Sequence, residues 1–193
     1  MFRMGAKMQS WKLNQKGLTL FELLASIVLL TIVASLAFSA YKFGVNAFQR
    51  ANEKSELQDE VRIASHVITS KTRFASEVEL LSDCPATFKP GFNYICINQK
   101  NGRSIEEHVY DTASASHVTH KIVTENLKDP ITYTVEFGKT SSSILAYKII
   151  SNKNQQRFEV NSEVSLLNIE LNKKTITTVG TSSFFALAYK ESA

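Results

Sequence analysis

The chain has 193 residues, which is enough for one modest domain with an extension but not for two full domains. Its formal net charge of +4 comes from the first 17 residues, because the rest of the chain balances 18 basic residues against 18 acidic ones. This distribution argues against a nucleic-acid-binding surface and favours a basic leader that stays on the cytoplasmic side of a membrane. The leader contains Arg3, Lys7, Lys12 and Lys16 and no acidic residue.

The first predicted element is an apolar helix over residues 18–41, which contain neither proline nor glycine. A helix of this length spans roughly 36 Å, enough to cross a hydrocarbon core of about 30 Å. A secretory signal predicts a shorter apolar core with a small-residue cleavage site, and a lipoprotein signal predicts a cysteine directly after the run. An uncleaved signal anchor fits the length and the charge. The polar residues of the run are Thr19, Glu22, Ser26, Thr31, Ser35 and Ser39.

Glu22 is the residue that a plain anchor does not explain. A charged side chain at the centre of a spanning helix costs about 2.5–3.5 kcal/mol, and less near an interface. If the chain is cut between Gly17 and Leu18, the new amine at Leu18 lies four residues from Glu22, on the same helical face. In a medium of low dielectric constant the two charges are tolerable as a pair. Glu22 of one chain would then neutralise the new amine of a neighbouring chain.

The sequence KGLTLFELLASIVLL, which begins at Lys16, resembles the class III signal of type IV pilins and pseudopilins. The resemblance implies cleavage after Gly17 by a membrane-embedded prepilin peptidase and N-methylation of the new terminus at Leu18. It also implies that Glu22 docks subunits during filament assembly. Leu18 stands where phenylalanine is commoner, and the absence of a helix-kinking proline from the run favours a minor pilin or pseudopilin. The implied partners are the peptidase, which is also the methylase, other pilins, the membrane and, for a competence pilus, DNA.

Residues 42–82 predict an amphipathic continuation of the helix, because apolar residues recur at three- or four-residue steps or their sum. No glycine or proline occurs between Gly44 and Pro85, so one helix is expected to reach about Glu79. A shorter helix followed by a second one is the alternative, with residues 69–76 as the weaker stretch. The apolar stripe is expected to pack on a sheet as ordinary core, and it comprises Leu57, Val61, Ala64, Ile68, Ala75 and Val78.

Residues 83–193 predict a β-rich globular head. Strands are expected at 92–98 and 104–110 on either side of the turn signal Lys100-Asn101-Gly102-Arg103, where Asn-Gly tolerates positive φ. Residues 131–137 alternate, which places Ile131, Tyr133, Val135 and Phe137 on one face. Further strands are expected at 144–150, 157–160, 164–171, 175–179 and 183–189. The predicted fold class is α+β, with one long N-terminal helix packed on an antiparallel sheet, as in pilins.

Cys84 and Cys96 are the only cysteines. If the head lies outside the cytoplasm, a disulfide between them is plausible, and closing a loop of this length would contribute roughly 3 kcal/mol. Two unpaired thiols are the alternative. No metal site is expected, because His117 and His120 would lie on opposite faces of a strand. No cofactor is expected, and no enzyme motif is found.

The combined prediction is a minor pilin or pseudopilin of a pilus, type II secretion or competence system, anchored in the cytoplasmic membrane with its N-terminus in the cytoplasm. After assembly it would lie in a surface or periplasmic filament. Residues 57–78 and the terminal SSFFALAYK are loosely similar to J-type and W-type minor subunits, and Gram-positive competence pseudopilins are about as similar. The rival hypothesis is an uncleaved, signal-anchored protein whose β-rich head binds a ligand at the cell surface.

Overall fold

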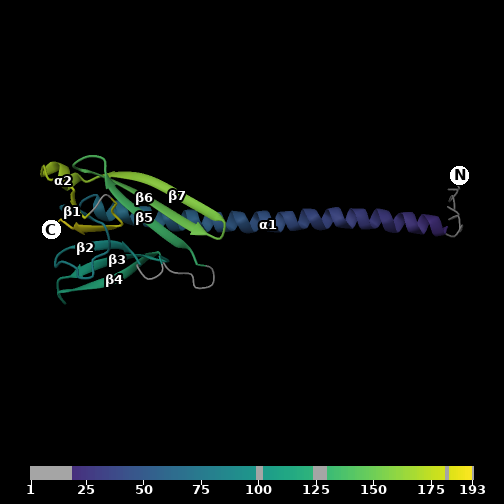
Figure 1. Cartoon of the computed structure of the whole chain (residues 1–193), viewed down its shortest axis with the longest axis horizontal. Coiled ribbons are helices and arrows are strands. Elements are labelled where there is room, and N and C mark those ends of the chain that lie inside the picture. Colours follow the sequence, from purple (N-terminus) through teal and green to yellow (C-terminus); the bar gives the residue numbers. More distant parts are fainter. Residues whose placement is uncertain (1–18, 99–101, 124–129, 181–182, 193) are drawn as a thin grey trace, which may run out of the picture. The chain divides into compact units, whose positions relative to one another are not determined.

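The computed structural model describes residues 19–98, 102–123, 130–180 and 183–192. The chain divides into two compact units between Ala47 and Phe48. A single helix, α1 (Leu20–Thr72), contributes to both units (Figure 1). Each unit is described by itself below. Gly17 and Leu18, the two residues expected at the cleavage site, lie outside the described residues.

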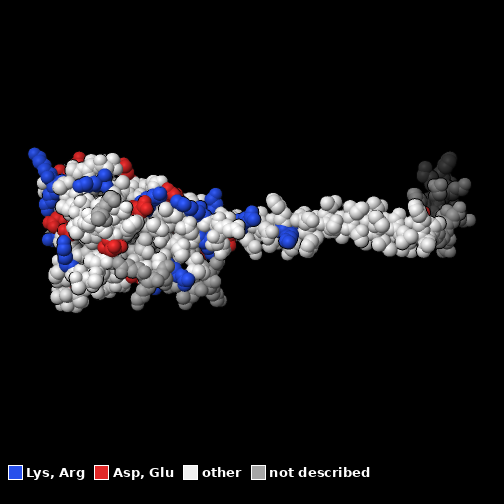
Figure 2. All heavy atoms as spheres, viewed as in Figure 1, with Lys and Arg blue, Asp and Glu red and all other residues white. Residues whose placement is uncertain are grey.

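In the first unit the described residues are all exposed. They form the apolar part of α1, and their large apolar side chains have no protein neighbour to cover them: Leu30 is 67% exposed and Phe38 also 67%. Among the described residues α1 is the one helix that is long and apolar enough to cross a membrane, judged by its length and composition alone. Figure 2 shows this stretch almost without Lys, Arg, Asp or Glu, whereas both signs of charge are interspersed over the visible face of the second unit.

In the second unit one apolar stripe of α1 is buried in the core. Leu57, Val61, Ala64 and Ile68 are each fully buried, which confirms the predicted spacing of three and four residues. Polar residues flank the stripe and are exposed or half-buried. The stripe packs in one core cluster with residues from both sheets of the unit.

The larger sheet of the second unit has six strands in the order β4-β3-β2-β9-β1-β8. All its neighbouring strands are antiparallel except β1 and β8, which are parallel. The strand bounds are β1 Glu77–Leu81, β2 Asn93–Ile97, β3 Ile105–Asp111, β4 Ser116–Val123, β8 Thr177–Val179 and β9 Ala186–Lys190.

A second sheet has three antiparallel strands in the order β5-β6-β7, with bounds Thr132–Lys139, Ile144–Lys153 and Gln156–Ser165. Ile131, Tyr133, Val135 and Phe137 are all buried, so the predicted alternation of β5 is confirmed. An isolated bridge between Phe137 and Phe184 links the two sheets. The fold is α+β, as predicted, but the strands form two sheets where one was expected.

The end of α1 differs from the prediction. The helix ends at Thr72, and residues 77–81, which were expected to be helical, form β1. Val78 and Leu80 are buried and their neighbours in β1 are half-buried, which is the period of two of a strand. The helical spacing of Ala75 and Val78 concealed this period in the sequence. Pairing of β1 with both β8 and β9 supplies backbone hydrogen bonds that outweigh a further turn of helix.

The expected strand at 164–171 is also different. Its first residues complete β7, and the remainder forms the short helix α2 (Leu167–Leu171). The Leu167 amide donates to Arg73 O and the Asn168 side-chain amide donates to Phe74 O, so α2 satisfies carbonyls that follow α1. Gly102 has the positive φ of +64° that the turn signal predicted, while Lys100 and Asn101 lie outside the described residues.

Candidate functional site

Thr19 and Glu22 form a reciprocal pair at the N-terminus of α1. The Thr19 amide donates to Glu22 Oε2 at 2.9 Å, and the Glu22 amide donates to Thr19 Oγ1 at 3.3 Å. The Thr19 hydroxyl lies 3.0 Å from the same carboxylate oxygen. With Thr19 as the N-cap and Glu22 three residues later, this geometry is a capping box, which satisfies two amides that the helix itself cannot.

The capping box fixes the direction of the Glu22 carboxylate. Its contacts within the described residues are made by Oε2, so Oε1 keeps its capacity to accept a hydrogen bond from another molecule. Both residues are exposed. The carboxylate lies beside the positive end of the helix dipole, which favours a negative charge at this position. The arrangement can hold a charge at the start of an apolar helix and present it to a cation.

The other polar side chains of the apolar segment are satisfied within the helix. Each hydroxyl donates to a backbone carbonyl three or four residues earlier, a pattern common where no water is present. The pairs are Ser26 with Glu22 O at 2.7 Å, and Thr31 with Val28 O, Ser35 with Ile32 O and Ser39 with Ser35 O, each at 2.8 Å. Glu22 is therefore the one charged group among the residues described from Thr19 to Tyr41.

Glu22 was expected from the sequence to be a functional residue, but the role of Thr19 as its capping partner was not predicted. The signal that could have identified Thr19 is the spacing Thr-x-x-Glu directly before an apolar run, which is the capping-box pattern. The expected docking role of Glu22 stays a prediction, as do cleavage after Gly17 and methylation of Leu18.

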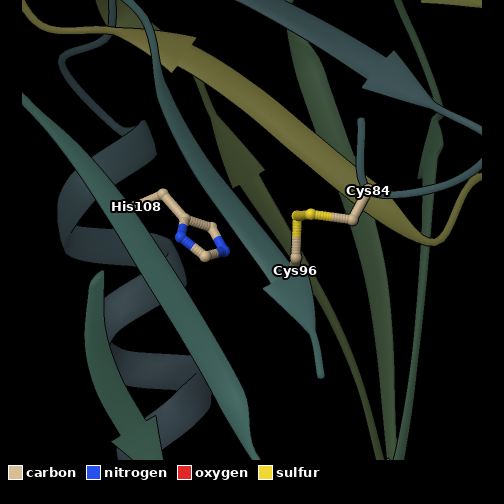
Figure 3. A group of neighbouring side chains, drawn as sticks. All are labelled: Cys84, Cys96 and His108. Carbon is tan, nitrogen blue, oxygen red and sulfur yellow. A yellow bond between two sulfur atoms is a disulfide. The ribbon is translucent and has the colours of Figure 1, made fainter. Parts of the chain in front are cut away.

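A second group of reactive side chains lies in the head. Cys84 and Cys96 are joined by a disulfide with a Cα–Cα distance of 5.6 Å. Candidate ligand atoms of Cys84, Cys96 and His108 lie within 4.8 Å of one another. Figure 3 shows the His108 ring, on β3, turned toward the disulfide. Sequence spacing gave no sign of this proximity, because it depends on the pairing of β2 with β3.

The two histidines that the sequence analysis weighed as a metal pair have different surroundings. His117 Nε2 lies 2.8 Å from the backbone oxygen of Phe92, and its ring packs 4.9 Å from Phe88. His120 is exposed and lies opposite Glu107 in the register of β3 and β4.

Comparison with known proteins finds a matching N-terminal motif and structures of similar fold. Residues 12–38 match the family model described as the prokaryotic N-terminal methylation motif. No curated protein sequence matches the chain. The structure resembles the PilB minor pilin from Streptococcus sanguinis, with a TM-score of 0.53, 9% sequence identity and coverage of 75% of this chain and 35% of that one. A mutant of the same minor pilin gives a TM-score of 0.57 at 13% identity, with coverage of 72% and 35%.

The chain thus combines an N-terminal methylation motif, a helix of membrane-spanning length and an α+β head whose fold is similar to that of a minor pilin. The chain has the fold of a minor pilin and spans about a third of the length of the PilB structures that it resembles. The methylation motif and the one apolar helix found among the described residues are consistent with anchoring in a membrane.

Proposed function

We propose that this chain is a minor pilin or pseudopilin, a structural rather than catalytic subunit of a type IV pilus-like filament. It is inserted in the cytoplasmic membrane with its N-terminus in the cytoplasm, cut after Gly17 and methylated at Leu18. It then enters the filament through the apolar part of α1. The filament serves pilus biogenesis, type II secretion or DNA uptake, and DNA is a partner only in the last case.

The observation that carries this proposal is the exposure of the apolar segment together with its one charge. Side chains such as Leu30 and Phe38 need lipid or other apolar helices around them. A bundle of such helices satisfies this need, and their hydroxyls require no partner outside their own helix. Glu22 then supplies the specific interaction that apolar packing lacks, because its Oε1 can pair with the terminal amine of a neighbouring subunit.

The first experiment tests processing. Mass spectrometry of the membrane-extracted protein, from cells that contain the prepilin peptidase, should find a terminus at Leu18 that carries an added methyl group. The same protein from cells without the peptidase is the control and should keep residues 1–17. An intact leader in both kinds of cell supports the alternative, an uncleaved anchor whose head binds a ligand.

A second experiment separates the charge of Glu22 from its capping role. Glu22→Gln retains a side chain that can cap the helix but removes the charge, because glutamine also serves in capping boxes. Thr19→Val retains the charge and removes the hydroxyl. If Glu22 docks subunits through its charge, Glu22→Ala and Glu22→Gln should both insert normally and incorporate into filaments at least about tenfold less, which corresponds to about 1.4 kcal/mol.

Incorporation is measured by immunoblotting, as the amount of the protein in sheared filaments relative to the amount in the membrane fraction. Thr19→Val should incorporate more than Glu22→Gln does. Normal incorporation of Glu22→Gln would leave Glu22 with a capping role alone and would refute docking through the charge.

Genes for an assembly ATPase and a platform protein beside this gene would identify which filament system uses the subunit.

A further inference from the structure

The Cys84–Cys96 disulfide lies in a small second core on the face of the six-stranded sheet opposite to α1. Tyr94, Cys96, Ala186 and Ala188 form this core, while Ile95, Leu187 and Tyr189, which alternate with them along β2 and β9, face the helix. The segment between β1 and β2 covers the core and carries Cys84 and Phe88. The Phe88 ring packs 4.5 Å from the ring of His108.

We propose that, when this disulfide is reduced, Cys84, Cys96 and His108 form a site for Zn²⁺. The observation that carries the proposal is that all three ligand atoms already lie within 4.8 Å of one another (Figure 3). Tetrahedral zinc binds sulfur at about 2.3 Å and imidazole nitrogen at about 2.0–2.1 Å, which places neighbouring ligand atoms roughly 3.3–3.8 Å apart. The sulfurs need only separate to this distance once their bond is broken.

The surroundings of His108 suit a metal ligand. Its Nδ1 lies 2.8 Å from the hydroxyl of Thr119 on β4, a contact that fixes the ring and leaves Nε2 for a metal. His108 lies opposite Tyr94 in the register of β3 with β2, two residues along the strand from Cys96. The two strands therefore hold two of the three ligands on one face of a sheet, where their spacing does not depend on a flexible loop.

The fourth ligand position is open to solvent. A hollow of about 370 Å³ lies beside the site and is lined by Cys84, Phe88, Glu106 and His108, among others. Glu106 Oε1 accepts hydrogen bonds from Asn98 Nδ2 at 2.8 Å and from Ser104 Oγ at 2.9 Å, so its carboxylate is held in the hollow. Three protein ligands with water in the fourth position is a common arrangement for zinc.

The reaction that opens the site is a two-electron reduction. A dithiol attacks one sulfur of the disulfide, a mixed disulfide forms, and closure of the dithiol to its own disulfide releases both cysteine thiols. Zn²⁺ then binds the two thiolates and one neutral imidazole, and two protons leave with the solvent. The disulfide and the zinc complex exclude each other, because each uses both sulfur atoms. The site does not depend on whether the chain assembles into filaments.

Cobalt binding to the full chain in detergent micelles tests the site. After reduction with a phosphine, one equivalent of Co²⁺ should give thiolate-to-metal charge-transfer absorption and the visible bands of a tetrahedral centre, and Zn²⁺ should displace it. His108→Gln should weaken Co²⁺ binding by at least about tenfold. His120→Gln, on the neighbouring strand, is the matched control and should bind as the unaltered chain does. Cys96→Ser should abolish the charge-transfer absorption.

A second readout follows disulfide formation. Zn²⁺ should slow re-formation of the disulfide by oxidised glutathione in the reduced chain and in His120→Gln, but not in His108→Gln. If reduction lowers the β-sheet signal in circular dichroism, Zn²⁺ should restore it. The proposal is overturned if the reduced chain gives no cobalt spectrum, if His108→Gln binds cobalt as tightly as the control, or if Zn²⁺ neither restores the signal nor slows oxidation.

Discussion

At the level of single residues, burial and neighbouring negative charges raise the pKa values of Glu60 and Tyr133. Burial raises the pKa of the Glu60 carboxyl above its ordinary value of 4.5, and the negative charges of Glu56 and Asp59 raise this pKa further. Tyr133 is 4% exposed, and its hydroxyl has no hydrogen-bond partner among the described residues. Burial raises the pKa of the Tyr133 hydroxyl, and the charges of Glu60 and Glu56 add to this effect. Carboxylates of α1 therefore lie near enough to Tyr133 on β5 to act on its hydroxyl.

Glu60→Gln should therefore stabilise the head at neutral pH. Between pH 4.5 and the raised pKa of Glu60 the folded chain binds more protons than the unfolded chain, so the Glu60 contribution to stability falls as pH rises through this window. The variant should gain less than about 1 kcal/mol at pH 7, because the side chain is partly solvated, and nothing well below pH 4.5. Urea unfolding of the full chain in detergent at both pH values measures this gain. Glu136→Gln, at an exposed position, is the control, and an equal gain in that variant would contradict the explanation.

At the scale of elements, polar contacts attach α1 to the three-stranded sheet. The hydroxyl of Tyr147, on β6, lies 2.7 Å from Ser65 Oγ and 2.8 Å from Thr69 Oγ1 and donates to Ser65 O at 3.1 Å. Farther along the same strand, Lys153, which is 4% exposed, contacts Glu56 Oε2 at 2.5 Å. These contacts fix the rotation and the position of α1 along β6, which apolar packing alone specifies less strongly.

Two buried tyrosines on the inner face of this sheet give a matched pair. Tyr147→Phe removes a hydroxyl with three hydrogen-bond contacts and should destabilise the head by about 1 kcal/mol, because the half-buried groups of Ser65 and Thr69 on α1 lose their partner. Tyr133→Phe removes a buried hydroxyl with no partner among the described residues and should be neutral or stabilising. Denaturant unfolding measures the change in the free energy of unfolding for each variant. Equal losses would show that the contacts of Tyr147 contribute nothing specific.

Secondary structure could be predicted where the spacing of apolar residues follows a single period, that of a helix or that of a strand. The stripe from Leu57 to Ile68 and the alternation of β5 both have a single face that is buried, so their patterns are unambiguous. Residues 77–81 fit a helix as well as a strand, and only the partners β8 and β9 decide between the two. Strand β4 was not among the strands expected from alternation, because most of its residues are exposed. These outcomes depend on tertiary contacts that a local pattern does not contain.

At the scale of the whole molecule, the two units differ in what stabilises them. Every residue that is buried among the described ones lies at or beyond Leu57, in the second unit. The described residues of the first unit, 19–47, are all exposed and form no core. In the sequence the apolar run and the amphipathic stripe already have different patterns, and Glu22 stands out because its charge contrasts with its surroundings; its docking role stays a prediction. The sequence alone does not predict how the described strands pair into two sheets or how His108 approaches Cys96, because both depend on long-range register.

A shortened chain that begins at Phe48 should consequently fold without detergent. It keeps the complete buried set and both sheets, and it loses only the exposed apolar residues of the first unit. We expect a monomer by analytical ultracentrifugation, the β-sheet signal in circular dichroism and cooperative thermal unfolding. The full chain, in contrast, should require detergent. Aggregation of the shortened chain would mean that residues before Phe48 contribute to the folding of the head.

The hydroxyls of Ser26, Thr31, Ser35 and Ser39 are bonded within their own turns, and this has an energetic consequence. When the segment is transferred from a bilayer to a bundle of similar helices, no hydrogen bond has to be broken or exchanged. The enthalpy of that transfer then comes from van der Waals contact and from the one ionic group. The hydroxyls of this segment therefore favour neither of the two environments over the other.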